Sequence, residues 1–94
     1  MRIQLELLGL SRLVAGTKQI ALDLEEGATY RDIVRVLSDM YPAMIGNVIQ
    51  PDRQSLQAPN IFNLNARQMI QSRQMENHLS DGDRVILMSM SAGG

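Results

Sequence analysis

The sequence has 94 residues, 45% of them hydrophobic, which is enough for one folded domain and too few for two independent cores. Nine basic and ten acidic residues are scattered and nearly cancel, which argues against a nucleic-acid-binding module, and the absence of cysteine excludes zinc fingers, iron–sulfur clusters and cysteine nucleophiles. No apolar run approaches the roughly 18 residues of a membrane span, so we expect a cytoplasmic protein without a membrane partner.

The first 27 residues predict two strands of an antiparallel hairpin. Apolar and polar residues alternate in RIQLEL, and again in QIALDL, which is the period of a half-buried strand. Between these runs the alternation breaks in LSRLVAGT, which Gly9 precedes and which contains Gly16. We expect this segment to be a loop longer than a two-residue turn.

After Gly27 the period changes to that of a helix. Thr29 is a candidate N-cap, and Asp32, three residues later, makes a variant of the capping box that also suits the helix dipole. Apolar residues then follow at spacings of three and four: Tyr30, Ile33, Val34, Leu37, Met40, Tyr41 and Met44. Pro42 should end or bend this helix near Tyr41.

The second half of the chain predicts short strands. Residues 46–59 contain Pro51 and Pro59 and are typical of a loop, whereas NIFNLNAR is a candidate strand. Residues 68–78 could hold an edge strand and a loop, without a clear boundary. We expect a tight turn at Asp81 and Gly82, with Leu79 anchored in the core.

The last apolar run, RVILMSM, is typical of a strand at the centre of a sheet. Its alternation places Val85, Leu87 and Ser89 on one face. It places Ile86, Met88 and Met90 on the other. The second set is either an exposed apolar surface for a partner or a further part of the core.

Three polar features are expected to be structural. Asp81 and Asp83 resemble part of a calcium loop, but no continuation supplies its other oxygen ligands, so we expect a turn and no metal site. His78 has no partners for a catalytic triad and is expected at the surface. Asn63 and Asn65 are expected to bond local backbone in a turn or at a strand edge.

This order of elements predicts an α+β protein of the β-grasp (ubiquitin-like) architecture. Its four- to five-stranded mixed sheet should be covered by one main helix, with the first and last strands parallel and adjacent. Residues 1–88 are expected to form the β-grasp domain. Residues 89–94 are expected to form an extended C-terminal tail that ends in Gly-Gly.

The last sixteen residues, LSDGDRVILMSMSAGG, resemble the tail of the ubiquitin-like sulfur carriers, the MoaD/ThiS family. That family includes the small subunit of molybdopterin synthase and the thiamine sulfur carrier, and its pattern is L-x-D-G-D-x-V, a strand, and a terminal Gly-Gly. The matching positions are Leu79, Asp81, Gly82, Asp83, Val85, Gly93 and Gly94. The segment NLNARQMI is similar to the family's strand-plus-Asn segment. The chain departs from the molybdopterin subunit in MSMSAGG, which replaces a Phe-Pro-Pro-like stretch, so we expect different contacts with a synthase partner.

The resemblance implies a carrier protein rather than an enzyme. An E1-like adenylating partner, using its own ATP and Mg²⁺, would adenylate the carboxylate of Gly94, and sulfur transfer would then give a thiocarboxylate. Gly93 would allow this end to approach a narrow site, because a Cβ would clash there. The partner-binding residues would be Ile86, Met88, Met90, Ser91 and Ala92, and the chain itself would bind no cofactor. The alternative is that the two glycines are an unstructured or engineered end.

Three functions remain open at this stage. The first is sulfur donation in cofactor biosynthesis, with molybdopterin as first choice and the molybdopterin synthase large subunit or another sulfur acceptor as partner. The second is a ubiquitin-like modifier joined through Gly94 to target-protein lysines, or a protein with a further role in tRNA thiolation. Lys18 is the only lysine, which makes polymers of varied linkage implausible. The third is a β-grasp binding module with an incidental Gly-Gly.

Overall fold

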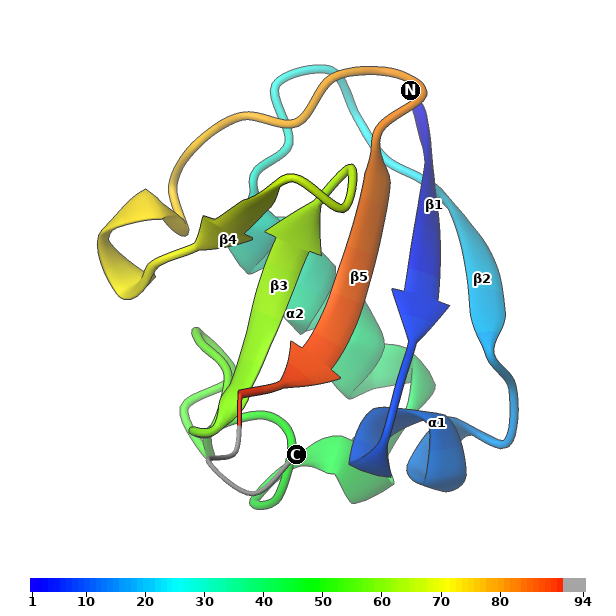
Figure 1. Cartoon of the computed structure of the whole chain (residues 1–94), viewed down its shortest axis with the longest axis vertical. Coiled ribbons are helices and arrows are strands. Elements are labelled where there is room, and N and C mark those ends of the chain that lie inside the picture. Colours follow the sequence, from blue (N-terminus) through cyan, green and yellow to red (C-terminus); the bar gives the residue numbers. More distant parts are fainter. Residues whose placement is uncertain (91–94) are drawn as a thin grey trace.

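The protein is represented by a computed structural model, of which residues 1–90 are described, and within them five strands form one mixed sheet (Figure 1). The strands are β1 (Arg2–Leu7), β2 (Gln19–Asp23), β3 (Asn60–Leu64), β4 (Gln68–Ile70) and β5 (Arg84–Ser89). The helices are α1 (Leu10–Ala15) and α2 (Tyr30–Met40), with short 3₁₀ turns at Pro42–Met44 and Ser72–Gln74. This is the mixed-sheet β-grasp architecture that the sequence predicts.

The two terminal strands lie side by side at the centre of the sheet. The strand order is β2-β1-β5-β3-β4, and β1 is parallel to β5, with Leu5 opposite Val85 and Leu7 opposite Leu87. The other neighbours are antiparallel. The predicted central position of the last strand is therefore confirmed, and its continuous apolar sequence follows from it.

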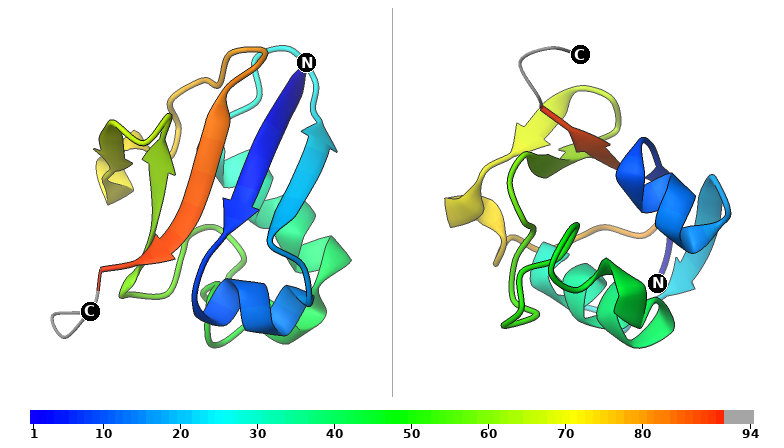
Figure 2. Two further views of the ribbon diagram at one scale, coloured as in Figure 1. Left: turned by 45° about the vertical axis from the view of Figure 1, so that its right-hand side comes forward. Right: turned by 90° about the horizontal axis from the view of Figure 1, so that it is seen from below.

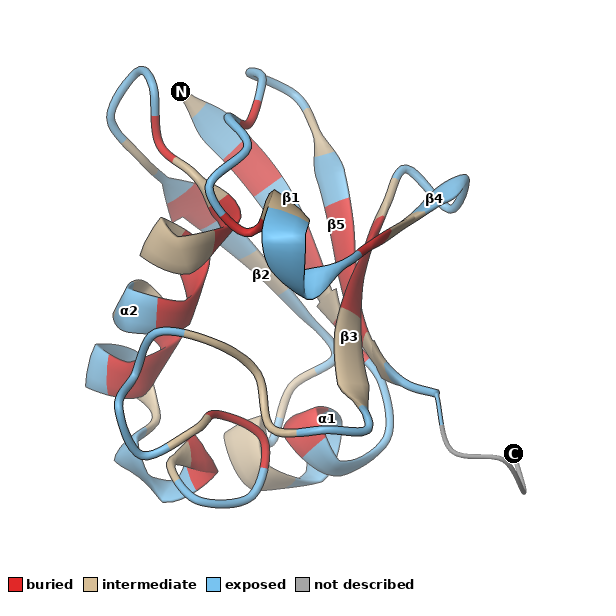
Figure 3. Ribbon diagram, turned by 90° about the vertical axis from the view of Figure 1, so that its left-hand side faces the viewer, coloured by how far each residue is buried: buried red, intermediate tan, exposed pale blue. Residues whose placement is uncertain are grey.

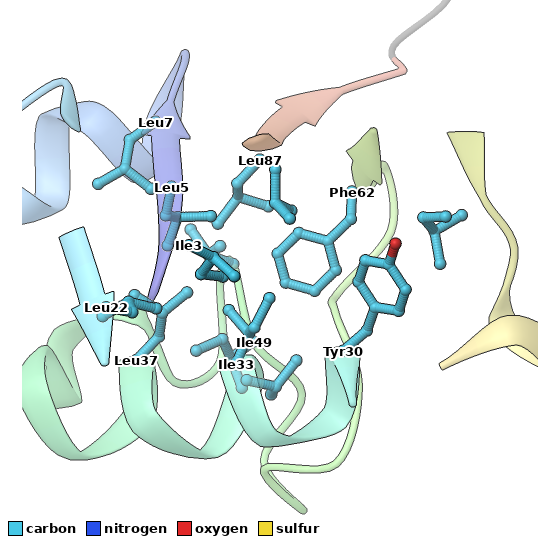
Figure 4. Packing of buried hydrophobic residues seen from close by; sticks show 14 of the residues in the cluster. Ile3, Leu5, Leu7, Leu22, Tyr30, Ile33, Leu37, Ile49, Phe62 and Leu87 are labelled. Carbon is cyan, nitrogen blue, oxygen red and sulfur yellow. The ribbon is translucent and has the colours of Figure 1, made fainter. Parts of the chain in front are cut away.

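Helix α2 packs across one face of this sheet and closes the core (Figure 2). Side chains from the strands meet those of the helix in a single layer, in which Leu5, Phe62 and Leu87 face Ile33 and Leu37 (Figure 4). All five are fully buried. The rings of Tyr30 and Phe62 lie 6.0 Å apart between centroids, so the two largest core side chains fill the space beneath β3.

The start and end of α2 agree with the sequence prediction. The carboxylate of Asp32 accepts hydrogen bonds from the backbone N–H of Thr29 (2.8 Å) and from its hydroxyl (3.3 Å), within the predicted capping box. The helix ends at Met40, just before Pro42, which begins a 3₁₀ turn.

The segment between β1 and β2 differs from the prediction of a loop, because it contains the six-residue helix α1. Ser11 is buried, and its hydroxyl donates to the carbonyl of Leu8 (3.0 Å). Gly16 ends the helix in the left-handed region (φ 74°), where its N–H bonds the carbonyl of Arg12 (2.9 Å). A helix shorter than two turns repeats its apolar pattern too few times for the period to show in the sequence.

Candidate functional site: the outer sheet face and the C-terminal strand

The two faces of β5 differ as its alternation predicts. Val85 and Leu87 point into the core and are fully buried. On the opposite, outer face, Met88 is half-buried and Met90, just beyond the strand, is 54% exposed. Ile86 also lies on the outer face but is only 7% exposed, so its neighbours on that face already cover it. Figure 3 shows this change from buried to exposed toward the end of β5.

Cross-strand neighbours extend the apolar surface beyond β5. Ile61 of β3 stands opposite Met88, and Asn63 stands opposite both Ile86 and Met69 of β4, so these side chains share the outer face. Ile61 and Met69 are half-buried. We call this surface the outer patch; its members are Ile61, Met69, Ile86, Met88 and Met90. Leu8, which is 44% exposed, follows β1 and donates its N–H to the carbonyl of Leu87 (3.0 Å), beside the patch.

The sequence analysis found only the β5 members of the outer patch. Ile61 and Met69 lie in strands with irregular alternation, and only the register between β3, β4 and β5 places them next to Met88 and Ile86. Register between distant segments is not contained in a local pattern. Both residues are apolar side chains at positions of β3 and β4 where a half-buried strand would carry polar residues, and that mismatch is the signal that points to them.

An ion pair borders the outer patch on β1. Arg84 donates from Nε to Oε1 of Glu6 (2.8 Å) and from Nη2 to Oε2 (2.9 Å) in a two-pronged arrangement. This hydrogen bonding from Arg84 lowers the pKa of Glu6. Since Glu6 stands opposite Ile86 across the β1–β5 pair, the carbon stems of the ion pair help to cover Ile86.

Asn63 is the one polar side chain enclosed by the outer patch, and it does not bond local backbone as predicted. It is 8% exposed, and its Nδ2 donates only to the Sδ of Met69 (3.4 Å). Among residues 1–90, its Oδ1 is buried and has no hydrogen-bond partner. Asn65 does bond backbone, but that of the neighbouring strand, where its Oδ1 accepts from the N–H of Arg84 (2.9 Å).

The carboxylates near the last turn have structural partners. Oδ1 of Asp81 accepts from the N–H of Arg2 (2.7 Å), and Oδ2 of Asp83 accepts from the N–H of Ser80 (2.8 Å). Within the described part of the chain, no group of three or more acidic, His or Cys side chains could hold a metal ion. His78 is exposed, with its Nδ1 2.6 Å from the carbonyl oxygen of Gly27. None of the helices in residues 1–90 has the length and apolar character needed to cross a bilayer.

The predicted tail begins where β5 ends. The strand stops at Ser89, and the N–H of Met90 donates to the carbonyl of Pro59 (2.8 Å). The predicted site residues Ser91, Ala92, Gly93 and Gly94 lie outside the described residues.

The topology and the α2-covered sheet define a ubiquitin-like β-grasp protein, and comparison with solved structures confirms this class. No protein-family model and no curated protein matches the chain. SAMP1 from Haloferax volcanii superposes with a TM-score of 0.81 at 21% identity, covering 100% of both chains. The HVO 2177 protein of the same organism has a TM-score of 0.79 at 28% identity, covering 100% of this chain and 87% of its own.

A third solved structure has the same fold. A putative molybdopterin converting factor, subunit 1, from Pyrococcus furiosus has a TM-score of 0.72 at 20% identity, covering 95% of this chain and 97% of its own. The β-grasp fold that the sequence predicts is therefore confirmed, and it is the fold of these small proteins.

Proposed function

We propose that the protein is a ubiquitin-like sulfur carrier that is activated at Gly94 and donates sulfur in cofactor biosynthesis, with molybdopterin as first choice. One observation carries the proposal: in the sequence, Gly93 and Gly94 follow shortly after β5, the central strand of a β-grasp sheet, and the outer face of β5 carries the half-exposed outer patch. The structural likeness to a putative molybdopterin converting factor subunit supports the choice of pathway.

The proposed chemistry has two steps, which the partner carries out. An oxygen of the Gly94 carboxylate attacks the α-phosphorus of ATP, and pyrophosphate leaves. Hydrosulfide supplied by the activating system then attacks the acyl carbon, AMP leaves, and loss of the proton leaves a thiocarboxylate at Gly94. Mg²⁺ and ATP belong to the E1-like adenylating partner, because the carrier supplies only the carboxylate. Gly93 and Gly94 lack a Cβ, which suits a narrow entry beside the nucleotide.

The outer patch is the proposed contact with that partner. Residues 89–94 span about 20 Å at most when extended, at roughly 3.3 Å per residue, so an enzyme that takes up Gly94 must lie close to the end of β5. Met88 and Met90 are the patch residues nearest to this end. Methionine side chains are flexible and polarizable, which suits a surface that adapts to a partner. Ser91 and Ala92 would line the entry path as small residues.

The test uses the E1-like adenylating enzyme from the same organism, with ATP and Mg²⁺. We expect carrier-dependent exchange of pyrophosphate into ATP and, once a sulfur donor is added, the mass gain of one oxygen replaced by sulfur in the intact protein. Deletion of Gly94 should abolish both signals, whereas Lys18→Arg, as the matched control, should leave both unchanged. Full activation of the Gly94-deleted chain would refute the proposal.

The alternative function is a modifier joined to lysines of target proteins through Gly94, with a further role in tRNA thiolation. The structural likeness to two small archaeal modifier proteins supports it. Expression in the native host should then give conjugates of higher mass that disappear on deletion of Gly94. A carrier confined to cofactor synthesis would instead yield free thiocarboxylate that is consumed when the molybdopterin synthase large subunit and its substrate are added.

A further inference from the structure

An unsatisfied amide lies within the surface where the partner is proposed to dock. Asn63 stands between Ile86 of β5 and Met69 of β4 on the outer face, and it is more than nine-tenths buried. Among residues 1–90, its side chain makes one hydrogen bond, the long one from Nδ2 to the Met69 sulfur (3.4 Å), and sulfur is a weak acceptor. Within residues 1–90, nothing donates to its Oδ1.

This arrangement is unfavourable for the isolated chain. A buried acceptor without a donor loses its hydrogen bonds to water and gains none in return. Asparagine is also a poor strand former, and the surrounding outer-face positions hold apolar side chains. A leucine at this place would bury the same surface without that cost, so the folded state alone gives no reason for an amide.

The geometry points to Asn63 as a specificity-determining residue for the activating partner, which we propose donates an N–H or O–H to its Oδ1. This inference rests on the proposed function, because the occupant is the same adenylating enzyme. That enzyme must lie at the end of β5 to reach Gly94, and the outer patch continues from Met90 and Met88 to Asn63 through Ile61 and Ile86.

A donor from the partner can reach the amide because a neighbour that contacts the amide is flexible. Met69, whose sulfur accepts from Nδ2, is half-buried and has an unbranched side chain with three rotatable bonds, so it can move aside and let the amide turn its Oδ1 toward the donor. Once the apolar surfaces exclude water, a partner without a donor leaves the acceptor unpaired. A polar group buried in an apolar interface therefore rejects such partners more strongly than apolar contact alone can.

The substitution Asn63→Leu tests this assignment in the full chain. We expect the KM for the carrier, measured by ATP–pyrophosphate exchange with the adenylating enzyme, to rise about tenfold while kcat stays unchanged, because the partner's donor then has no acceptor. The denaturant midpoint of the free variant should stay the same or rise, because the unsatisfied acceptor is gone. The matched control, Asn77→Leu, makes the same exchange at an exposed position outside the outer patch and should leave KM within about threefold of the wild type.

Each other outcome overturns the assignment. An unchanged KM for Asn63→Leu shows that the partner makes no bond to the amide. A raised KM together with a lowered denaturant midpoint shows that Asn63 acts by holding the sheet together. If the wild-type chain supports exchange and the KM of Asn63→Leu equals that of the wild type, the inference about Asn63 fails and the proposed function stands. If the wild-type chain supports no exchange, the proposed function fails and the inference falls with it.

Discussion

The inner and outer faces of β5 differ in burial, because alternate residues of this strand point into the core and away from it. On the inner face, Val85 and Leu87 are fully buried against α2 and its neighbours. On the outer face, Met88 and Met90 keep exposed surface, and the buried Asn63 next to them has an unsatisfied oxygen. The inner face is apolar and closed, whereas the outer face exposes apolar side chains and holds a buried acceptor without a donor among residues 1–90.

This contrast distinguishes residues that maintain the fold from residues that, in the function proposed above, contact the partner. Exposed apolar surface and unpaired buried polar groups both raise the free energy of the isolated chain. Natural proteins keep such features mainly where a function requires them. Stability and activation should therefore respond to changes on opposite faces of β5.

The largest difference is expected for adjacent residues on the two faces. Leu87→Ala should lower the free energy of unfolding by about 2–5 kcal/mol, because it leaves a cavity in a closed core. Met88→Ala should lower it by about 1 kcal/mol or less, because the side chain is half-exposed. Denaturant unfolding gives both values, and pyrophosphate exchange should show a raised KM for Met88→Ala.

The two variants are informative together because Leu87 and Met88 are adjacent in β5 and lie on opposite faces of the sheet. Leu87→Ala should activate with a normal KM at temperatures where it remains folded. If Met88→Ala proved as destabilising as Leu87→Ala, the outer face would be a second core rather than a docking surface. If both variants kept the wild-type KM, the partner would contact another part of the chain.

A smaller effect is expected at the helix cap that holds α2 over the inner face. The pKa of Asp32 is lowered, chiefly by the hydrogen bond from the Thr29 N–H and also by Arg35, whose Nη2 lies 2.6 Å from Oδ1, while burial opposes the shift. A lowered pKa stabilises the fold above the unfolded value of about 3.9, and this contribution disappears as the pH falls through the folded value.

Asp32→Asn should therefore cost about 1 kcal/mol near pH 7 and less at about pH 2, because the stabilisation by the wild-type carboxylate is lost as the pH falls through its folded pKa. Denaturant unfolding of both proteins at the two pH values measures the difference. The KM for activation near pH 7 should stay at the wild-type value, because α2 covers the face opposite the outer patch. If the stability difference between Asp32→Asn and the wild type stayed equally large in acid, it would come from the shape of the side chain and not from the charge of Asp32.

The inner face could be predicted from sequence because its signals are local and repeat several times. The stripe from Tyr30 to Leu37, the Thr29–Asp32 cap and the alternation in β1 each repeat or reinforce a simple period. The outer patch could be predicted only in part, since Ile61 and Met69 join it through strand register. The prediction that Asn63 bonds local backbone is wrong, because the burial of Asn63 depends on three strands at once.

The smallest effect is expected at the turn that joins β3 to β4 and carries no patch residue. Asn65 and Ala66 both have positive φ (54° and 60°), and the N–H of Arg67 bonds the carbonyl of Leu64 (2.9 Å) to close a left-handed turn. Asparagine tolerates this conformation, but alanine pays about 1–2 kcal/mol in steric strain.

Ala66→Gly removes that strain and adds about 0.5–1 kcal/mol of backbone entropy to the unfolded chain, so we expect a net stabilisation of about 0.5 kcal/mol. Denaturant unfolding should show a raised midpoint at constant slope, and Arg67→Gly, outside the two left-handed positions, should show no such gain.

Because the turn positions Met69 through the register of β4, an unchanged KM for Ala66→Gly would show that added stability at this end of the sheet leaves the outer patch intact. A lower midpoint for Ala66→Gly would mean that Ala66 is not strained, and a raised KM would mean that docking depends on the stiffness of the β3–β4 turn.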